Sequence, residues 1–154
     1  MGSSITTAIL SALKTAMQGV NGAGSYTYDL SATDQVNIGA QWPPPIVPYA
    51  YIRLVRVSTA DTAPLGHYGR TVECQVFGFV HATADTAQAR TTAAADLMDD
   101  LMLAIESDRK LGIGVVRDVH VEATAFDGGD ENFAPGFGVA GMVVTVDLAR
   151  VTGA

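Results

Sequence analysis

The sequence predicts an α+β domain, with two main helices packed on one face of a single mixed or antiparallel β-sheet. Two segments, at residues 5–18 and about 84–107, repeat apolar residues at helical spacing, whereas other segments alternate apolar and polar residues as strands do. Helices stand on both sides of a strand pair along the chain, which favours one sheet covered on one face. A chain of 154 residues has the length of one domain, 1–154.

The first helix is expected at residues 5–18, where Ser3 or Ser4 can cap its N-terminus. Its apolar stripe repeats every four residues and consists of Ile5, Ile9, Leu13 and Met17. Gly19 ends the helix. Two short β-prone pieces are expected next, at residues 26–30 and 35–38.

Consecutive prolines at 43–45 follow Trp42 and exclude both a helix and a central strand, because they lack the backbone donor. Trp42 has two interpretations. It is either part of a rigid spacer whose indole covers the edge of the core, or a wedge against a neighbouring subunit. A strand is then expected at residues 49–57, followed by a polar loop at 58–69.

Residues 70–81 show the clearest strand alternation in the chain. The residues expected to face the core are Val72, Cys74, Val76 and Val80. Phe77 and Phe79 alternate onto the opposite face. If helices cover only one side of the sheet, these rings need another cover, and we expect it to be a second copy of the chain.

The second helix is expected at about 84–107, capped by Thr83 or Asp85 and stopped by Gly112. Its predicted buried stripe consists of Ala94, Leu97, Met98, Leu101 and Ile105. Its predicted solvent-facing acids are Asp96, Asp99, Asp100 and Glu106. The neighbouring carboxylates of Asp99 and Asp100 are therefore interpreted as part of a solvated face rather than a catalytic pair.

Two final strands are expected, at about 115–124 and 139–151, and an acidic, aromatic loop lies between them. Three interpretations of this loop stay open: a solvated hairpin loop, a calcium loop using Asp127, Asp130, Glu131 and Asn132, or a docking loop. The spacing of the acids argues against calcium, because calcium loops place ligands at alternate positions. As a docking loop, its expected contact residues are Phe126, Asp127, Asp130, Glu131, Phe133 and Phe137.

Composition argues against several functional classes. The net charge is −7, whereas a DNA-binding surface needs a basic footprint. The single cysteine, Cys74, cannot form an internal disulfide. No apolar run approaches the roughly 20 residues that span a membrane.

The sequence also lacks the usual signs of an enzyme. The three histidines, His67, His81 and His120, are scattered, whereas zinc needs clustered ligands. No Gly-x-Ser-x-Gly nucleophile elbow and no dinucleotide fingerprint occurs. We therefore expect no enzyme activity, catalytic residue, metal or cofactor. A small α/β enzyme, with His81 or His120 near a carboxylate in a pocket, remains the alternative from another class.

The order of elements resembles the tail terminator, or tail completion, proteins of long-tailed bacteriophages and gene-transfer particles. The matching features are the opening helix 5–17, the proline-rich entry into a strand at 43–48, the strand 70–78, the helical run 93–105 with its closing Asp108-Arg-Lys-Leu-Gly, and Val116-Arg-Asp-Val. The resemblance spans nearly the whole chain and is one of pattern and order.

This resemblance implies a virion structural protein, assembled in the host cytoplasm, that forms a hexameric ring at the head–tail junction. Such a ring caps the tail tube, ends tube polymerisation and joins the tail to the head connector, while DNA passes through its lumen without specific binding. Its partners are then itself, the tail tube protein and a connector or stopper protein. A head-completion or stopper protein is the alternative. We expect Trp42, Phe77 and Phe79 between subunits and the 126–137 loop toward the tube or connector.

Overall fold

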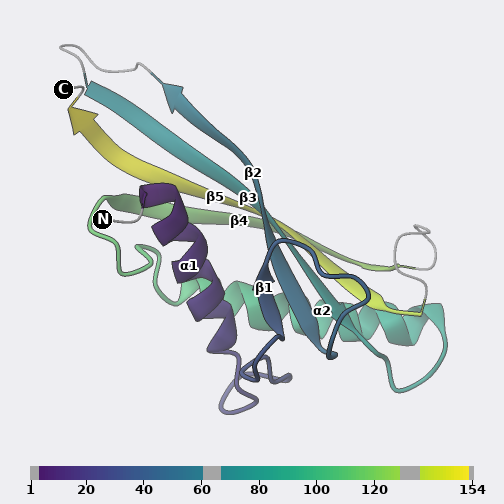
Figure 1. Cartoon of the computed structure of the whole chain (residues 1–154). Coiled ribbons are helices and arrows are strands. Elements are labelled where there is room, and N and C mark those ends of the chain that lie inside the picture. Colours follow the sequence, from purple (N-terminus) through teal and green to yellow (C-terminus); the bar gives the residue numbers. More distant parts are fainter. Residues whose placement is uncertain (1–3, 61–66, 129–135, 153–154) are drawn as a thin grey trace.

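A computed structural model describes residues 4–60, 67–128 and 136–152, in which five strands form one sheet with two helices (Figure 1). The elements are α1 (Ile5–Gln18), β1 (Val36–Ile38), β2 (Tyr49–Ala60), β3 (His67–Val80), α2 (Ala87–Glu106), β4 (Val116–Asp127) and β5 (Gly138–Thr152). The strand order is β1-β2-β3-β5-β4. β1 is parallel to β2, and the other pairs are antiparallel. The predicted α+β class with a mixed sheet is confirmed.

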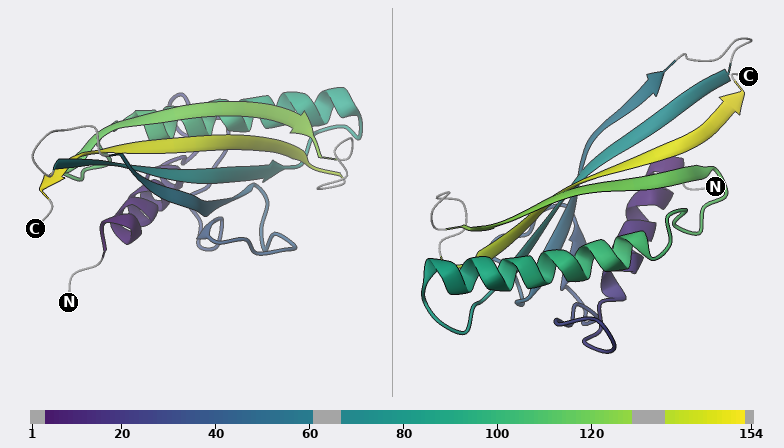
Figure 2. Two further views of the ribbon diagram at one scale, coloured as in Figure 1. Left: turned by 90° about the horizontal axis from the view of Figure 1, so that it is seen from above. Right: turned by 180° about the vertical axis from the view of Figure 1, so that it is seen from behind.

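Both helices bury their apolar stripes against the same face of the sheet. The helical core residues include Ile9, Leu13 and Met17 of α1 and Leu97, Leu101 and Ile105 of α2. Alternate strand residues complete this core, among them Ile52, Val72, Cys74, Val76, Val144 and Val146. The predicted alternation of β3 is therefore confirmed. Figure 2 shows the sheet twisting strongly, with α2 lying across the strands.

The caps of the two helices differ in how well the sequence predicted them. The side chain of Ser4 accepts a hydrogen bond from the backbone N–H of Thr7 at 3.1 Å, as expected. The second helix instead begins after Thr86, whose hydroxyl accepts from Ala89 N–H. The reason is that β3 ends at Val80 and residues 81–86 must first cross from the sheet to the helical layer. Neither helix of the described residues is long and apolar enough to cross a bilayer.

Helix α2 ends at Glu106, within one residue of the predicted end, and Gly112 follows six residues later. Two features of the strands depart from expectation. The polar loop expected at 58–69 is shorter, because β2 continues to Ala60 and β3 begins at His67. A bulge in β2 between Leu54 and Arg56 also shifts its alternation.

The β-prone piece at 26–30 is not a strand, because its backbone is bound by a helix side chain. The buried carboxylate of Asp100 accepts hydrogen bonds from the backbone N–H groups of Thr27, at 3.0 Å, and Tyr28, at 2.8 Å. The prediction that Asp100 faces water is therefore wrong, whereas Asp99 beside it is exposed. Asp100 lies three residues after Leu97 and four before Ala104, on the buried stripe of α2.

Two glycines let α2 lie close to the sheet. A Cβ atom at Gly138 in β5 would collide with the backbone carbonyl oxygen of Arg90. A Cβ atom at Gly78 in β3 would lie 2.8 Å from Cδ2 of Leu97. Gly138 therefore needs a residue without a side chain, because backbone lies in the way, whereas a Cβ atom at position 78 would require only the end of the Leu97 side chain to shift.

Candidate interaction surface

The face of the sheet opposite the helices carries a band of aromatic side chains near the end where β3 finishes and β5 begins. We call this band the aromatic face and define it by Trp42, Tyr49, Tyr51, Phe77, Phe79, Phe126 and Phe137. Strand register explains its position. Tyr49, Phe79, Val139 and Phe126 form one row across the four long strands. The side chains of one row point to the same side of a sheet.

Phe79 lies at the centre of the aromatic face and is fully buried. Its ring centroid is 5.4 Å from that of Trp42, 6.0 Å from Tyr51 and 6.1 Å from Phe137. Trp42 also contacts Phe137 edge to face, at 5.9 Å. Trp42 itself is 55% exposed, so it covers Phe79 and still presents half of its surface to solvent.

The segment between β1 and β2 holds Trp42 against the sheet. The hydroxyl of Tyr49 accepts a hydrogen bond from the backbone N–H of Gln41 at 3.2 Å and another from Nδ2 of Asn37 at 3.2 Å. The Trp42–Pro43 and Val47–Pro48 peptides are cis. Gln41, the residue before Trp42, is thus bound to the buried Tyr49, which gives the indole a defined place on the aromatic face.

A shallow hollow of about 430 Å³ lies on the same face, over Gly141 of β5. Its sides include Phe77 and Phe126. A Cβ atom at Gly141 would lie 3.7 Å from the ring of Phe77 and 3.6 Å from that of Phe126. A smaller hollow of about 280 Å³ lies beside Trp42, Tyr51 and Phe79. The aromatic face is therefore contoured and only partly covered by the chain itself.

The structure brings together the described aromatic residues of the expected docking loop and those of the expected subunit surface, which are separate in the sequence. Phe137, from the expected docking loop, contacts Trp42 and Phe79, from the expected subunit surface. Phe126 packs against the same cluster. The remaining predicted loop residues, Asp130, Glu131 and Phe133, and with them Asn132, lie outside the described residues.

Asp127 is buried beneath the end of the sheet and is bound by an arginine. Nε and Nη2 of Arg90 donate to its two carboxylate oxygens at 2.9 and 3.0 Å. Nη1 of Arg90 pairs with exposed Asp85. Arg90 was not singled out from the sequence, because no local pattern links it to a carboxylate 37 residues away. In this arrangement both oxygens of Asp127 already have a partner within the chain.

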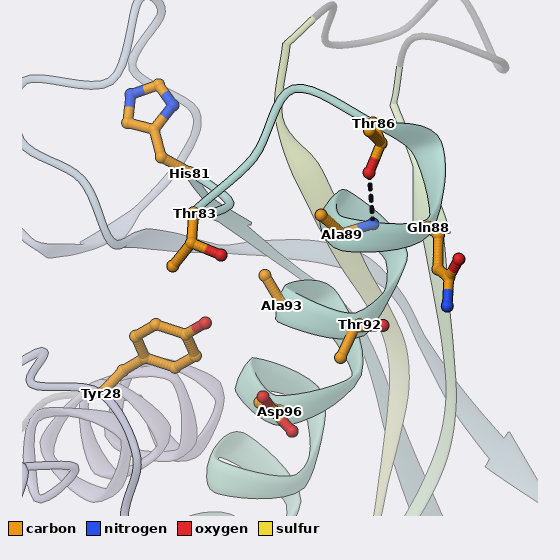
Figure 3. Close-up of a pocket in the computed structure, with 9 residues that line it drawn as sticks. All are labelled: Tyr28, His81, Thr83, Thr86, Gln88, Ala89, Thr92, Ala93 and Asp96. Carbon is orange, nitrogen blue, oxygen red and sulfur yellow. Dashed lines mark hydrogen bonds between the residues drawn. The ribbon is translucent and has the colours of Figure 1, made fainter.

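Another hollow, outside the aromatic face, lies between the start of α2 and the loop at Tyr28, with a volume of about 390 Å³ (Figure 3). Its walls are Tyr28, His81, Thr83, Thr86, Gln88, Ala89, Thr92, Ala93 and Asp96. Burial, and then the charges of Asp96 and Asp100, raise the pKa of the Tyr28 hydroxyl.

The arrangement in this hollow bears on the alternative of an enzyme. The imidazole of His81 points away from Asp96 in Figure 3 and stacks on Phe137, with centroids 4.7 Å apart. The other histidine considered, His120, lies 3.6 Å from Glu122 on an exposed strand surface. Among residues 4–60, 67–128 and 136–152, no three His, Cys, Asp or Glu side chains cluster as a metal site would require. The hollow thus offers hydroxyls and a carboxylate, without a histidine–carboxylate pair.

Comparison with protein-family models and with curated proteins finds no match. Comparison with solved structures finds a chain from the structure described as the virion of a native gene transfer agent (GTA) particle. The TM-score is 0.57 at 12% sequence identity, and the match covers 96% of this chain and 98% of that chain. At this identity the two proteins share a fold, over nearly the full length of both.

Proposed function

We propose that this protein is a structural component of a tailed-phage-like virion and acts as its tail terminator. The observation that carries the proposal is the shared fold with a chain of a gene transfer agent virion, which extends over 96% of this protein. The order of sequence features that resembles tail terminators points to the same kind of particle. In this proposal the protein acts by binding other virion proteins, without a chemical step.

In the proposed mechanism, copies of the chain form a ring, with six copies as the family resemblance implies. One side of the ring occupies the growing end of the tail tube and stops further addition of tube subunits. The other side presents a different surface to the head connector. Six chains of net charge −7 would carry about −42 together, which disfavours adhesion of DNA phosphates to the lumen.

The aromatic face supplies the proposed contact residues. Trp42 and Phe77 are proposed to face a neighbouring subunit, with the buried ring of Phe79 supporting Trp42 from beneath. Phe126 and Phe137 are proposed to lie toward the tube or the connector. Aromatic side chains suit such contacts because they bury a large area at low cost in conformational entropy. Phe137 contacts Trp42, so the two sets of residues adjoin. The proposed subunit contact would therefore lie next to the surface proposed to meet the tube or the connector.

The decisive experiment polymerises the cognate tail tube protein with and without this chain and measures tube lengths by negative-stain electron microscopy. A terminator shortens the length distribution in proportion to its concentration and labels one tube end. Unchanged tube lengths, together with binding to portal complexes, would instead assign the protein to the head side as a stopper. Unchanged lengths without any binding would reject both assignments.

A further inference from the structure

The described residues leave two edges of the sheet open: one is formed by β1 and, beyond residue 52, by β2, and the other is formed by β4. β1 pairs only with residues 50–52 of β2. From Arg53 to Ala60, β2 therefore has a strand on one side only, which is β3. β4 pairs with β5 along its length and has no strand on its other side. Each open edge presents backbone donors and acceptors that another strand can pair.

The open edge of β2 also carries exposed apolar side chains. Leu54, Val55 and Val57 are 41%, 43% and 44% exposed. In Figure 1 this part of β2 extends beyond α1, so neither helix covers it. An apolar and unpaired edge strand is a site of association through strand addition.

Charges at the two open edges are complementary. Arg53 on β2, Gln75 on β3, Val143 on β5 and Glu122 on β4 form one row across the sheet. Arg53 and Glu122 are both exposed and stand at opposite ends of this row. A second copy placed beside the first along the row therefore brings the Glu122 edge of one chain next to the Arg53 edge of the other.

Strand direction is also compatible with placing the β4 edge of one copy beside the β2 edge of another. β2 is antiparallel to β3, β3 to β5, and β5 to β4. β4 therefore runs opposite to β2. If the sheet continues into the next copy without reversal, the new β4–β2 junction is antiparallel, as are three of the four pairings within the chain.

We propose that β4 of one copy pairs with the open edge of β2, residues 53–60, of the next copy, with Glu122 beside Arg53. The inference deepens the proposed function, because it rests on the proposed ring and names the surfaces that would close it. Such a contact is head-to-tail, and repeated contacts of this kind give a ring when the rotation closes. The Phe126 end of β4 would then pass beside β1 of the neighbour.

The first test is a charge swap in the full-length chain, read as oligomer size by sedimentation velocity and mass photometry. We expect Arg53→Glu or Glu122→Arg alone to weaken self-association by roughly tenfold or more, because each places like charges across the junction. The double variant R53E/E122R restores the attraction and should recover assembly. Arg70→Glu is the matched control, since it makes the same change on the internal strand β3.

The second test is a cross-link. Arg53→Cys and Glu122→Cys in one chain should form disulfides between chains on oxidation, giving a ladder of covalent oligomers on denaturing gels. Neither single-cysteine variant should give more than dimers. The native Cys74 does not compete, because it is buried and burial raises the pKa of its thiol to about 11.

The results separate this inference from the proposed function. If the wild-type chain shortens tail tubes but both single charge variants assemble like it, or the double variant fails to recover, the edge contact is wrong and the function stands. If the charge swap behaves as expected but tube lengths do not change, the edge contact stands and the terminator assignment fails. A wild-type chain that stays monomeric at every concentration, with and without tubes, overturns both.

Discussion

The guanidinium of Arg90 and the carboxylate of Asp127 form a two-bond ion pair that joins the first turn of α2 to the last residue of β4. The Asp127 side chain is 2% exposed and that of Arg90 16%. The pair lies beside Gly138, which is the register partner of Asp127 and faces the backbone of α2 at Arg90. It therefore positions the end of the sheet from which Phe126 and Phe137 extend onto the aromatic face.

Arg90→Met should lower the free energy of unfolding by about 3 kcal/mol, because it leaves a buried carboxylate without its charged partner. Urea denaturation followed by circular dichroism measures the change. The exposed Arg109–Asp118 pair is the matched control, and Arg109→Met should leave stability nearly unchanged. A neutral Arg90→Met variant would contradict a role for the ion pair in holding α2 to β4.

Asp100→Ala should destabilise the fold by about 2 kcal/mol, because the backbone N–H groups of Thr27 and Tyr28 lose their acceptor. The neighbouring substitution Asp99→Ala changes an exposed carboxylate on the same helix and serves as the control. Amide hydrogen exchange gives a second readout. Exchange at residues 27 and 28 should accelerate in Asp100→Ala and stay slow in Asp99→Ala.

Gly138→Ala should cost about 3 kcal/mol or more, since the new methyl group overlaps the backbone of α2 and neither element can move without disturbing the core. Gly114→Ala is the control, because nothing lies within 4 Å of a Cβ there. Thermal unfolding of the two variants compares the effects. Equal melting temperatures would mean that α2 is not held as close to β5 as described.

Stability should fall as pH rises above about 9, through the thiol of Cys74. Burial, and to a lesser extent Glu73, raises its pKa from 9.0 to about 11. Between these values the unfolded chain releases the proton while the folded chain keeps it, so unfolding is favoured by up to about 1.4 kcal/mol per pH unit. Tyr28 and Tyr51, whose pKa values are also raised, add to the fall at higher pH.

The substitution Cys74→Val isolates the thiol contribution. The slope of unfolding free energy against pH between 9 and 10 should become shallower in this variant, whatever its absolute stability. A slope identical to that of the wild-type chain would show that Cys74 ionises in the folded state as easily as in the unfolded one.

Trp42 is the only tryptophan and is 55% exposed in the single chain, so its fluorescence reports on the proposed subunit surface. Assembly should shift its emission to shorter wavelength and reduce quenching by acrylamide about twofold or more, because the indole loses contact with water. The Arg53→Glu variant at the same concentration supplies the unassembled reference. Rings in which Trp42 is quenched as in the monomer would exclude it from the subunit contact.

Local patterns were sufficient for the elements whose contacts repeat along the chain. The four-residue stripe of α1 and the alternation of β3 each mark one buried face, because a core selects apolar side chains at every turn or every second residue. These two patterns, with the stripe of α2, led to the α+β class and to helices on one face. They also identified Phe77 and Phe79 as residues on the face without helices.

Boundaries and single polar residues were predicted less well. The start of α2 depended on how many residues the chain needs to leave the sheet, and that length is set by the distance between layers. Asp100 is expected to face water together with the other acids of the helix, although its spacing from Leu97 places it on the buried stripe. A carboxylate can be buried there because the backbone N–H groups of residues 27 and 28 donate hydrogen bonds to it, which offsets the cost of removing it from water.

The sequence by itself determined the layers of this protein, because the spacing of apolar residues within each helix or strand shows which of its faces is buried. Only the tertiary structure decided which distant side chains meet, as Phe137 does with Trp42 and Arg90 with Asp127. It also placed Arg53 and Glu122 at opposite ends of one row across the sheet. Such pairings depend on strand order and register. These are properties of the assembled sheet, and no single stretch of the chain contains them.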